Sequence, residues 1–389
     1  MAGTGLSTLG SCGSEVEQRM PPAKDWHSDP EWRRVKYGEW NGPGVDPGPG
    51  PMDGVLLKNY APRSTVVSQR TKVPKARFPV IDVHSHHYAE EVDGNVEDQI
   101  SKWVETQNEV GVEKTVILTS ASGESFDRLV KFYLDPYPDQ FLLYCGVERK
   151  GTEAEDYPEK AAKELERCYE MGARGIGELS DKGFGYTRDE KLRPEERLHP
   201  EDDRLDPFWR KAAELGLPVV THISDHPSAW TPPDVFQERT PIFQQYNKYG
   251  GSGETYEEIL KHLPAVVQKH PETTFIACHI ANLGNDLQRV SALLDRFPNL
   301  YLDISARDYE IGRTPRASKK FIEKYEDRLL FGTDMGMDKS MYQAWWHLLE
   351  TDDEYMTGRV WWPYYGLDLS EGSLEALYRG NAERILNWG

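Results

Sequence analysis

The chain has 389 residues, and its 46 Lys and Arg against 65 Asp and Glu give a formal net charge of -19. This acidic balance argues against nucleic acid and anionic membrane surfaces as partners, because neutralising phosphates requires clustered basic side chains. The length suits one large α/β domain or two ordinary domains. No apolar run approaches the roughly 18 residues that would suggest a membrane span.

Residues 1–76 are rich in Gly and Pro, as in "NGPGVDPGPGPMDG", and show little periodicity. Such a segment buries little apolar surface, so we predict an N-terminal extension that is either a disordered leader or an arm. Three tryptophans, Trp26, Trp32 and Trp40, favour an arm that docks on its own domain or on a partner subunit. Residues 77–389 are predicted to form the functional domain.

The cysteines predict no disulfide framework, but one of them is relevant to the cellular location. Cys12 ends "LGSC", which resembles the cleavage site of a bacterial lipoprotein, but neither a basic start nor an apolar core precedes it. A cytoplasmic location is the default prediction, with export to the periplasm or as a lipoprotein if the natural chain begins earlier. Cys145 and Cys278 lie in apolar runs and are expected to be small core residues.

Eight short apolar runs follow residue 77, each ending in turn or polar residues and rich in β-branched side chains, which is typical of strands. In chain order the runs are 78–84, 114–120, 141–148, 172–180, 218–224, 274–281, 299–306 and 328–336. Amphipathic stretches with helical spacing lie between them, and most end at Gly or Pro. Those stretches are 96–111, 158–172, 207–216, 256–271 and 287–298.

Strand followed by helix, eight times over, predicts an α/β chain folded as a (β/α)8 TIM barrel. Strands that are apolar along almost their whole length suit a parallel sheet whose outer face is covered. The alternative is an open doubly wound sheet, which would usually show a glycine-rich phosphate loop after its first strand. The sequence at that position is "HSHH", so the barrel is favoured.

Metal-type side chains recur at the ends of the predicted strands, where barrel chemistry takes place. His84 and His86 end the first strand, His222 the fifth, His279 the sixth and Asp334 the eighth. Residues two apart in a strand point to the same face, so both histidines of the first strand should face the mouth. Any one histidine alone could be a satisfied core residue. Together they predict a divalent-metal site, because Zn²⁺ prefers imidazole nitrogens and carboxylate oxygens.

The motifs "VIDVHSHHY", "VVTHISD", "FIACHIAN", "LLFGTDMG" and "YRGNAERIL" resemble the amidohydrolase superfamily. The most similar branch is the amidohydrolase-related (amidohydrolase 2) group, which holds metal-dependent hydrolases and non-oxidative decarboxylases. The likeness covers about residues 78–388 and leaves out the extension. It implies a small-molecule substrate, a divalent cofactor that is zinc or else manganese or another ion, and a homo-oligomer.

The resemblance also assigns roles to individual residues. It implies that His84, His86, His222 and Asp334 ligate the metal. The strand-six histidine, His279, would ligate a second metal, polarise the substrate or act as an acid.

Glu178, in "GIGELS" of the fourth strand, divides the branches of the superfamily. It is similar to the glutamate of TatD-type hydrolases, whereas the mononuclear decarboxylases generally lack a bridging carboxylate there. Glu178 is therefore expected to contact a metal, directly or through water, with one or two ions bound. The alternative is a carboxylate that only orients a ligand imidazole.

The leading hypothesis is a hydrolase in which metal-activated water attacks a small-molecule ester, amide, lactone or related bond. Asp334 would shuttle the proton, and His279 would stabilise the oxyanion or serve as acid. The alternative is a metal-dependent decarboxylase, a lyase acting on an aromatic or unsaturated carboxylic acid. A third hypothesis is a barrel that keeps its ligands for stability and binds a partner through tryptophan-rich loops.

Two further residues are candidates for substrate binding. Arg307, just past the seventh strand, could pair with a substrate carboxylate or could be a surface arginine. Trp230 lies in the long loop of residues 225–254, which is expected to cover the mouth. The tryptophan-rich segment 344–368 could stack on a planar ring or could pack against the arm or a neighbouring subunit.

Overall fold

The structure is a computed structural model of the chain. It describes residues 50, 53–56, 59, 63, 65–89, 95–233, 237, 239, 247–356 and 362–386. The chain divides into two compact units, Met1–Ser64 and Thr65–Gly389. The predictions for Cys12, Trp26, Trp32 and Trp40 concern positions outside the described residues. The proposed boundary between residues 76 and 77 likewise stays a prediction.

The described residues of the second unit contain an eight-stranded parallel sheet whose order follows the sequence. The strands are β1 (Val80–Ser85), β2 (Val112–Leu118), β3 (Phe141–Cys145), β4 (Ala173–Asp181), β5 (Val219–Ile223), β6 (Phe275–Ala277), β7 (Leu300–Asp303) and β8 (Leu329–Leu330). Hydrogen bonds from Val83 N to Phe331 O, at 2.9 Å, and from Asp334 N to His84 O, at 2.8 Å, join β1 to the segment after β8. The sheet is thus nearly closed, and the predicted TIM barrel is confirmed.

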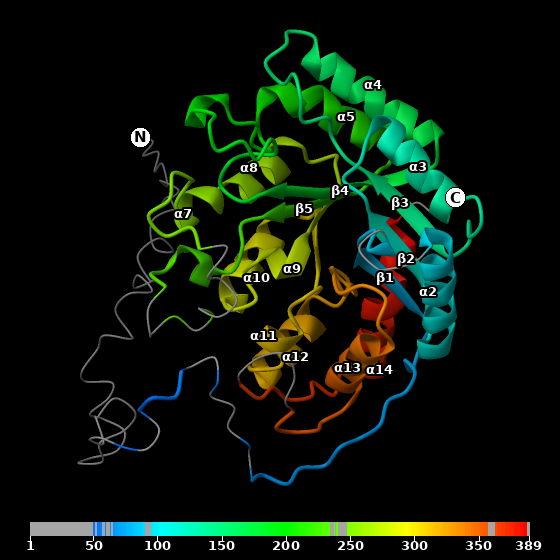
Figure 1. Cartoon of the computed structure of the whole chain (residues 1–389), viewed down its shortest axis with the longest axis vertical. Coiled ribbons are helices and arrows are strands. Elements are labelled where there is room, and N and C mark those ends of the chain that lie inside the picture. The colour runs from blue at the N-terminus through cyan, green and yellow to red at the C-terminus, as the bar shows by residue number, and fades with distance from the viewer. Residues whose placement is uncertain are drawn as a thin grey trace, which may run out of the picture. The chain divides into compact units, whose positions relative to one another are not determined.

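Helices alternate with the strands and cover the outside of the barrel (Figure 1). The longer helices are α2 (Val96–Val110), α3 (Gly123–Tyr133), α4 (Tyr157–Glu170), α5 (Asp206–Glu214), α8 (His262–Lys269), α10 (Leu287–Arg296), α12 (Pro315–Lys324) and α13 (Lys339–Glu350). The shorter ones are α7 (Tyr256–Ile259), α9 (Cys278–Ala281), α11 (Asp308–Ile311), α14 (Glu371–Glu375) and α15 (Asn381–Ile385). Short 3-10 turns and one π-helical turn are η3 (Pro194–Glu196), η4 (Asp203–Leu205), η5 (Pro227–Trp230) and η6 (Ala376–Gly380).

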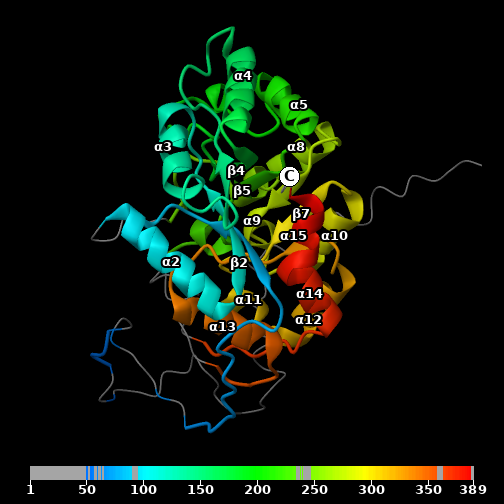
Figure 2. The same ribbon diagram turned by 90° about the vertical axis from the view of Figure 1, so that its right-hand side faces the viewer.

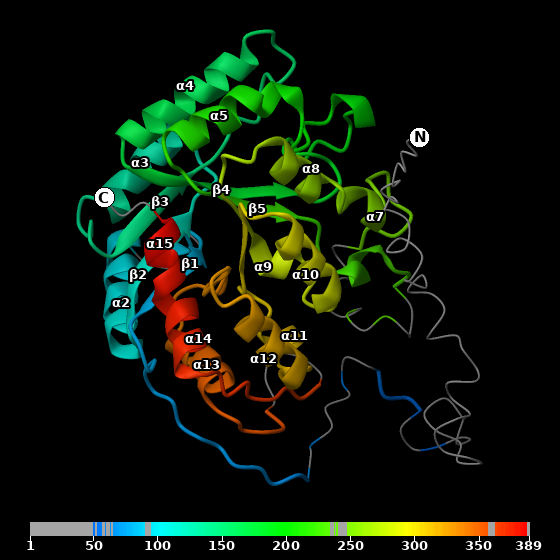
Figure 3. The same ribbon diagram turned by 180° about the vertical axis from the view of Figure 1, so that it is seen from behind.

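The views from the side and from behind show α2 to α5 following one another around one side of the barrel (Figures 2 and 3). The C-terminal segment returns to the start of the barrel, where η6 contacts both β1 and β8. No helix among the described residues combines the length and the apolar character needed to cross a membrane.

Local signals explain where the helices begin and end. The Asn95 side chain accepts a hydrogen bond from Glu97 N at the start of α2, and the helix stops at Gly111, which adopts φ 93°. The single helix predicted for residues 256–271 is instead two helices, α7 and α8. Pro264 lies in the first turn of α8 and has no N–H to donate to the preceding turn, so α7 cannot continue through it.

Alternate strand residues face two separate apolar clusters, as strand geometry requires. In β2, Val116 and Leu118 belong to a smaller cluster built from strand residues and α15, whereas Ile117 belongs to a larger cluster between the sheet and the helices. Both clusters are almost completely buried. This packing fixes the strands, and therefore fixes the positions from which the strand-end side chains project.

Candidate metal centre

The side chains predicted to bind metal or to act in catalysis converge at the carboxyl ends of the strands. They come from five strand ends: His84 and His86 at β1, Glu178 at β4, His222 at β5, His279 after β6 and Asp334 after β8. In a barrel this end is where catalytic side chains gather.

Asp334 lies beside three imidazoles. Its Oδ1 is 3.1 Å from His86 Nε2 and 3.5 Å from His84 Nε2, and its Oδ2 is 3.9 Å from His279 Nε2. The donor atoms of His84, His86 and Asp334 all lie within 4.8 Å of one another. Ligands bound at about 2.0–2.2 Å from a common tetrahedral zinc ion stand about 3.3 Å apart. The three side chains therefore have the spacing of co-ligands.

Glu178 occupies the other half of the cluster. Its Oε2 is 3.8 Å from His86 Nε2, and its Oε1 is 3.6 Å from His279 Nε2 and 4.0 Å from His84 Nε2. The same Oε1 accepts a hydrogen bond from Nδ1 of His222. Glu178 thus contacts or faces all four imidazoles, a position suited to a bridging carboxylate.

Hydrogen bonds at Nδ1 orient three of the four imidazoles. Their Nδ1 atoms contact, each at 2.9 Å, Asp303 Oδ2 for His84, Leu118 O for His86 and Ser305 O for His279. A carbonyl oxygen can only accept, so His86 and His279 donate from Nδ1. In the neutral ring the proton is then absent from Nε2, which turns its lone pair toward Asp334 and Glu178.

The contacts of His222 are with Glu178 and Asp225, and its role as a metal ligand stays a prediction. Its Nδ1 points to Glu178, its Nε2 lies 3.5 Å from Asp225 Oδ1, and it belongs to neither of the ligand groups that include His84. Its ring centroid is 4.6 Å from that of His279. His222 therefore joins the cluster through Glu178.

Orphaned nitrogens test whether a cation suits this site. Within the described part of the chain, Nε2 of His84 and Nε2 of His222 are buried and have no hydrogen-bond partner. A buried polar atom without a partner costs about 1–3 kcal/mol, and a bound cation would provide that partner. Soft-to-borderline imidazole nitrogens beside ionised carboxylates are the donors that Zn²⁺ and Mn²⁺ accept. The donor set fits a divalent cation.

Electrostatics keep both carboxylates ionised. Burial alone would raise the pKa of Glu178, but His222, His279 and His84 hold that pKa well below its usual value. Burial opposes ionisation of Asp334 in the same way, and the adjacent His84 and His86 hold its pKa well below the ordinary range. Burial lowers the pKa of His279, although Glu178 partly opposes the shift, so its ring is neutral near pH 7.

Two glycines let the strands approach closely enough to form the cluster. Gly177 precedes Glu178, adopts φ +146°, and a Cβ there would lie 2.8 Å from the carbonyl oxygen of Val220 on the neighbouring strand. Gly332 stands two residues before Asp334, and a Cβ there would lie 2.7 Å from Cβ of His84. Side chains at these positions would force apart the strands that carry the ligands.

The segment that carries His279 is a left-handed turn. Residues His279, Ile280, Ala281 and Asn282 have φ values of 57°, 55°, 53° and 54°. The Asn282 side chain donates to Ile223 O at 3.1 Å and to Ser224 O at 3.2 Å, and His279 N donates to Asp303 Oδ1 at 3.0 Å. These bonds to β5 and β7 hold a backbone conformation that non-glycine residues seldom adopt.

Two residues that no sequence motif marks, Asp303 and Ser305, orient the predicted ligands. Asp303 is fully buried, and although burial would raise its pKa, His84 and Ser305 lower the value to about 2. Ser305 Oγ lies 2.8 Å from His279 Nδ1 and 3.1 Å from His84 Nδ1. The available signal was an acidic residue at the end of the apolar run "LYLD", where only a paired charge can be buried.

The two substrate-binding candidates are held by contacts within the protein. Arg307 is only 8% exposed, so it is not a surface arginine; it donates to the Asn282 side chain and lies 3.4 Å from Glu310. Trp230 packs against Tyr256 and donates from Nε1 to Glu254 O at 2.8 Å. Substrate binding by either residue stays a prediction.

The tryptophan-rich segment is described in part. Trp345 and Trp346 belong to α13 and are buried against Phe331, at ring centroid distances of 5.6 Å and 5.1 Å. They pack the barrel rather than presenting a ring to a ligand. Trp361 lies outside the described residues.

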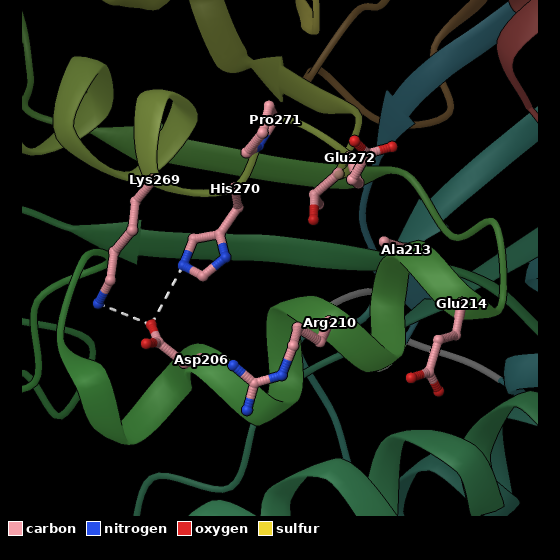
Figure 4. Close-up of a pocket in the computed structure, with 9 residues that line it drawn as sticks. Asp206, Arg210, Ala213, Glu214, Lys269, His270, Pro271 and Glu272 are labelled. Carbon is pink, nitrogen blue, oxygen red and sulfur yellow. Dashed lines mark ion pairs between the residues drawn. The ribbon is translucent and has the colours of Figure 1, made fainter.

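A separate pocket of about 660 Å³ lies outside the cluster (Figure 4). It is lined by α5 residues such as Asp206 and Arg210 and by the turn from Lys269 into β6. None of the strand-end histidines lines it. Its position at the amino end of β6 is the end of the barrel associated with stability rather than with chemistry.

The chain resembles known proteins in both sequence and fold. The family model described as amidohydrolase matches residues 81–388. No curated protein matches the chain.

Solved structures resemble the fold at low sequence identity. 2,6-Dihydroxybenzoate decarboxylase from Rhizobium has a TM-score of 0.50 and 16% identity, over 79% of this chain and 98% of that one. 5-Carboxyvanillate decarboxylase from Novosphingobium aromaticivorans, complexed with manganese and 4-hydroxy-3-methoxy-5-nitrobenzoic acid, has a TM-score of 0.51 and 14% identity, over 82% and 99%. A putative amidohydrolase from Staphylococcus aureus has a TM-score of 0.50 and 15% identity, over 79% and 99%.

Proposed function

Because the chain belongs to the amidohydrolase family, we propose that it is a metal-dependent hydrolase of a small molecule. Water attacks an ester, amide, lactone or related bond of that substrate. The observation that carries this proposal is the position of Glu178, which faces four imidazoles across from Asp334. Two ionised carboxylates around one set of histidines are suited to activating water and moving its proton.

His84, His86 and Asp334 would hold the cation, with His222 and Glu178 completing its surroundings. When bound, a divalent cation supplies Lewis acidity that makes water a competent nucleophile near neutral pH. Zinc is the proposed ion, and manganese is the alternative that the 5-carboxyvanillate decarboxylase complex suggests. One or two ions are proposed; His84 belongs to two metal-type groups, one with His86 and Asp334 and one with Glu178, Cys278 and His279, but its Nε2 can ligate only one ion.

The chain's own groups would handle the proton. Asp334 is ionised, so a carboxylate oxygen can accept the proton of the attacking water and return it to the leaving group. His279 is neutral, its Nδ1–H is engaged with Ser305 O, and its Nε2 faces the centre. In that tautomer Nε2 can accept a hydrogen bond from the attacking water and orient it toward the substrate.

The test is turnover and product mass with zinc-loaded or manganese-loaded protein on a panel of esters, amides, lactones and hydroxybenzoates. We expect a product that has gained water. Asp334→Asn should reduce kcat by at least about 100-fold, the usual scale for losing a general base. Asp352→Asn, at an exposed aspartate away from the centre, is the matched control. Full activity in Asp334→Asn would remove the residue from the mechanism.

Decarboxylation of an aromatic or unsaturated carboxylic acid is the second candidate, and Arg149 favours it. Within the described residues, Arg149 Nε is buried without a hydrogen-bond partner. Burial first, and then the like charge of Arg188, lowers the pKa of Arg149, whereas Glu178 opposes that shift. A guanidinium that interacts electrostatically with Glu178 and has a buried N–H without a partner in the described part of the chain suits a substrate carboxylate. Loss of CO₂ instead of gain of water in the same panel would replace the first proposal with this one.

A further inference from the structure

A second cluster of histidines and carboxylates lies outside the candidate metal centre. Asp181 is the last residue of β4, His199 lies in the segment between β4 and α5, Glu254 ends the long loop after β5, and His262 opens α8. The elements that bring them together, β4, α7 and α8, lie on the same side of the barrel (Figure 1). None of these side chains belongs to the family motifs.

The four side chains form a continuous chain of close contacts. Asp181 Oδ2 lies 2.7 Å from His199 Nδ1, which lies 3.9 Å from Glu254 Oε2, and that oxygen lies 2.9 Å from His262 Nε2. The two imidazoles are stacked, with centroids 4.1 Å apart and planes 9° from parallel. Tetrahedral ligands of zinc stand about 3.3 Å apart. Two of the three contacts between the side chains are shorter than this distance and one is longer.

The cluster has more acid than base. Three carboxylates, Asp181, Glu201 and Glu254, form their ion pairs with His199 and His262 in the described part of the chain. Even with both imidazoles protonated, one negative charge remains. Asp181 has no exposed surface, so its carboxylate is poorly hydrated and needs a positive partner, and a divalent cation between neutral imidazoles would supply the same charge as two protonated imidazoles.

The remaining contacts already orient the donor atoms. Glu201 Oε1 lies 2.6 Å from His262 Nδ1, so the Nε2 atom that contacts Glu254 is the one that would bind a cation. Asp181 Oδ1 accepts from Gly183 N and Gly185 N, each at 2.9 Å, so the Oδ2 atom that contacts His199 is the one that would bind a cation. Carboxylates that bond the distal nitrogen of a ligand histidine in this way are typical of zinc sites.

We propose that Asp181, His199, Glu254 and His262 bind a second divalent cation of the zinc type at a structural site. Four protein ligands complete a tetrahedron without water, as in structural rather than catalytic zinc sites. The ion ties the segment after β4 and the loop after β5 to the barrel. Since Glu254 O also accepts from Trp230 Nε1, the site would anchor the loop that carries Trp230.

The first test counts ions on the full-length protein after dialysis against zinc chloride and then buffer. Wild type should contain one more zinc per chain than His199→Gln. His270→Gln is the control, because His270 also lies at an end of α8 and faces a carboxylate, Asp206, at 3.2 Å; its zinc content should equal that of wild type. Equal zinc content in wild type and His199→Gln would overturn the proposal.

A second test avoids relying on how the His199 variant folds. In His84→Ala/His86→Ala protein, which lacks the candidate catalytic ligands, added Co²⁺ should give the intense visible absorption of a tetrahedral complex, and zinc should displace it. Chelation should lower the Tm of this variant. A protein with native circular dichroism that shows neither the absorption nor the Tm shift would contradict the second site. Turnover plays no part in this readout, so the result is independent of the proposed hydrolase activity.

Discussion

The buried carboxylate of Asp303 lies 2.9 Å from Nδ1 of His84, on the side of the ring away from Asp334 and Glu178. This contact fixes the orientation of the imidazole and makes Nε2 more basic. A residue that does not face the centre thus controls how well a predicted ligand could bind a cation.

Asp303→Asn should therefore weaken metal binding without unfolding the barrel. The amide preserves the volume but removes the charge, and we expect zinc affinity to fall by about 10-fold to 100-fold. Competition with a chromophoric chelator measures this affinity, and circular dichroism checks the fold. Unchanged affinity in the variant would mean that His84 is not a ligand or does not need its buried partner.

Gly332→Ala should damage both stability and activity. The new Cβ would lie 2.7 Å from Cβ of His84, so β1 and β8 must separate, at a cost of about 1–3 kcal/mol in the free energy of unfolding. Urea denaturation measures the change. Gly372→Ala is the control, because nothing lies within 4 Å of a Cβ placed there, and its stability should stay the same or rise slightly.

His226 should make the protein sensitive to acid. Burial, followed by Arg239 and Arg307, lowers the pKa of His226 from 6.5 to about 2. Below the unfolded-state pKa the unfolded chain binds a proton that the folded chain does not, so stability falls as pH falls. The slope is at most about 1.4 kcal/mol per pH unit.

The comparison is between wild type and His226→Gln, by urea unfolding from pH 7 down to about pH 4. Below pH 6.5, the ordinary pKa of histidine, the free energy of unfolding should depend on pH less steeply in the variant. The difference in slope should be close to that expected for one bound proton. Identical slopes in the two proteins would show that His226 is protonated in the folded state.

Trp346→Ala should be strongly destabilising. The side chain is fully buried, with ring centroids of Phe331 and Tyr378 at 5.1 Å and 5.2 Å. Removing such a ring costs about 3–5 kcal/mol, which thermal unfolding would report as a lower Tm. Tyr249→Ala, at a side chain 58% exposed, should change the Tm little. A stable Trp346 variant would mean that the α13 packing does not hold β8.

The convergence of the strand-end side chains could be predicted because polar residues interrupt the apolar runs at fixed places. His84 with His86, Glu178 and Asp334 stand where the runs end, and the barrel brings those ends together. The orientation of His222 was beyond such reasoning, since a hydrogen bond from the neighbouring strand decides it. Rotamers depend on contacts that have no sequence signature.

Other features of the structure could not be predicted from the sequence, for different physical reasons. Asp303 was read as part of a strand, because the sequence does not reveal which buried acid meets which histidine. The cluster of Asp181, His199 and His262 is assembled by irregular segments whose paths no periodicity predicts. The division of residues 256–271 into two helices, by contrast, could have been foreseen from Pro264.

The left-handed turn at His279–Asn282 has a mechanical implication. Each non-glycine residue in that conformation costs roughly 1–2 kcal/mol relative to the right-handed form. The hydrogen bonds from Asn282 to Ile223 and Ser224 therefore hold a strained backbone in place. Loss of these two hydrogen bonds would let the backbone relax and would move the His279 ring away from Glu178 and Asp334. A substitution at Asn282 would therefore impair the centre although it leaves every candidate ligand unchanged.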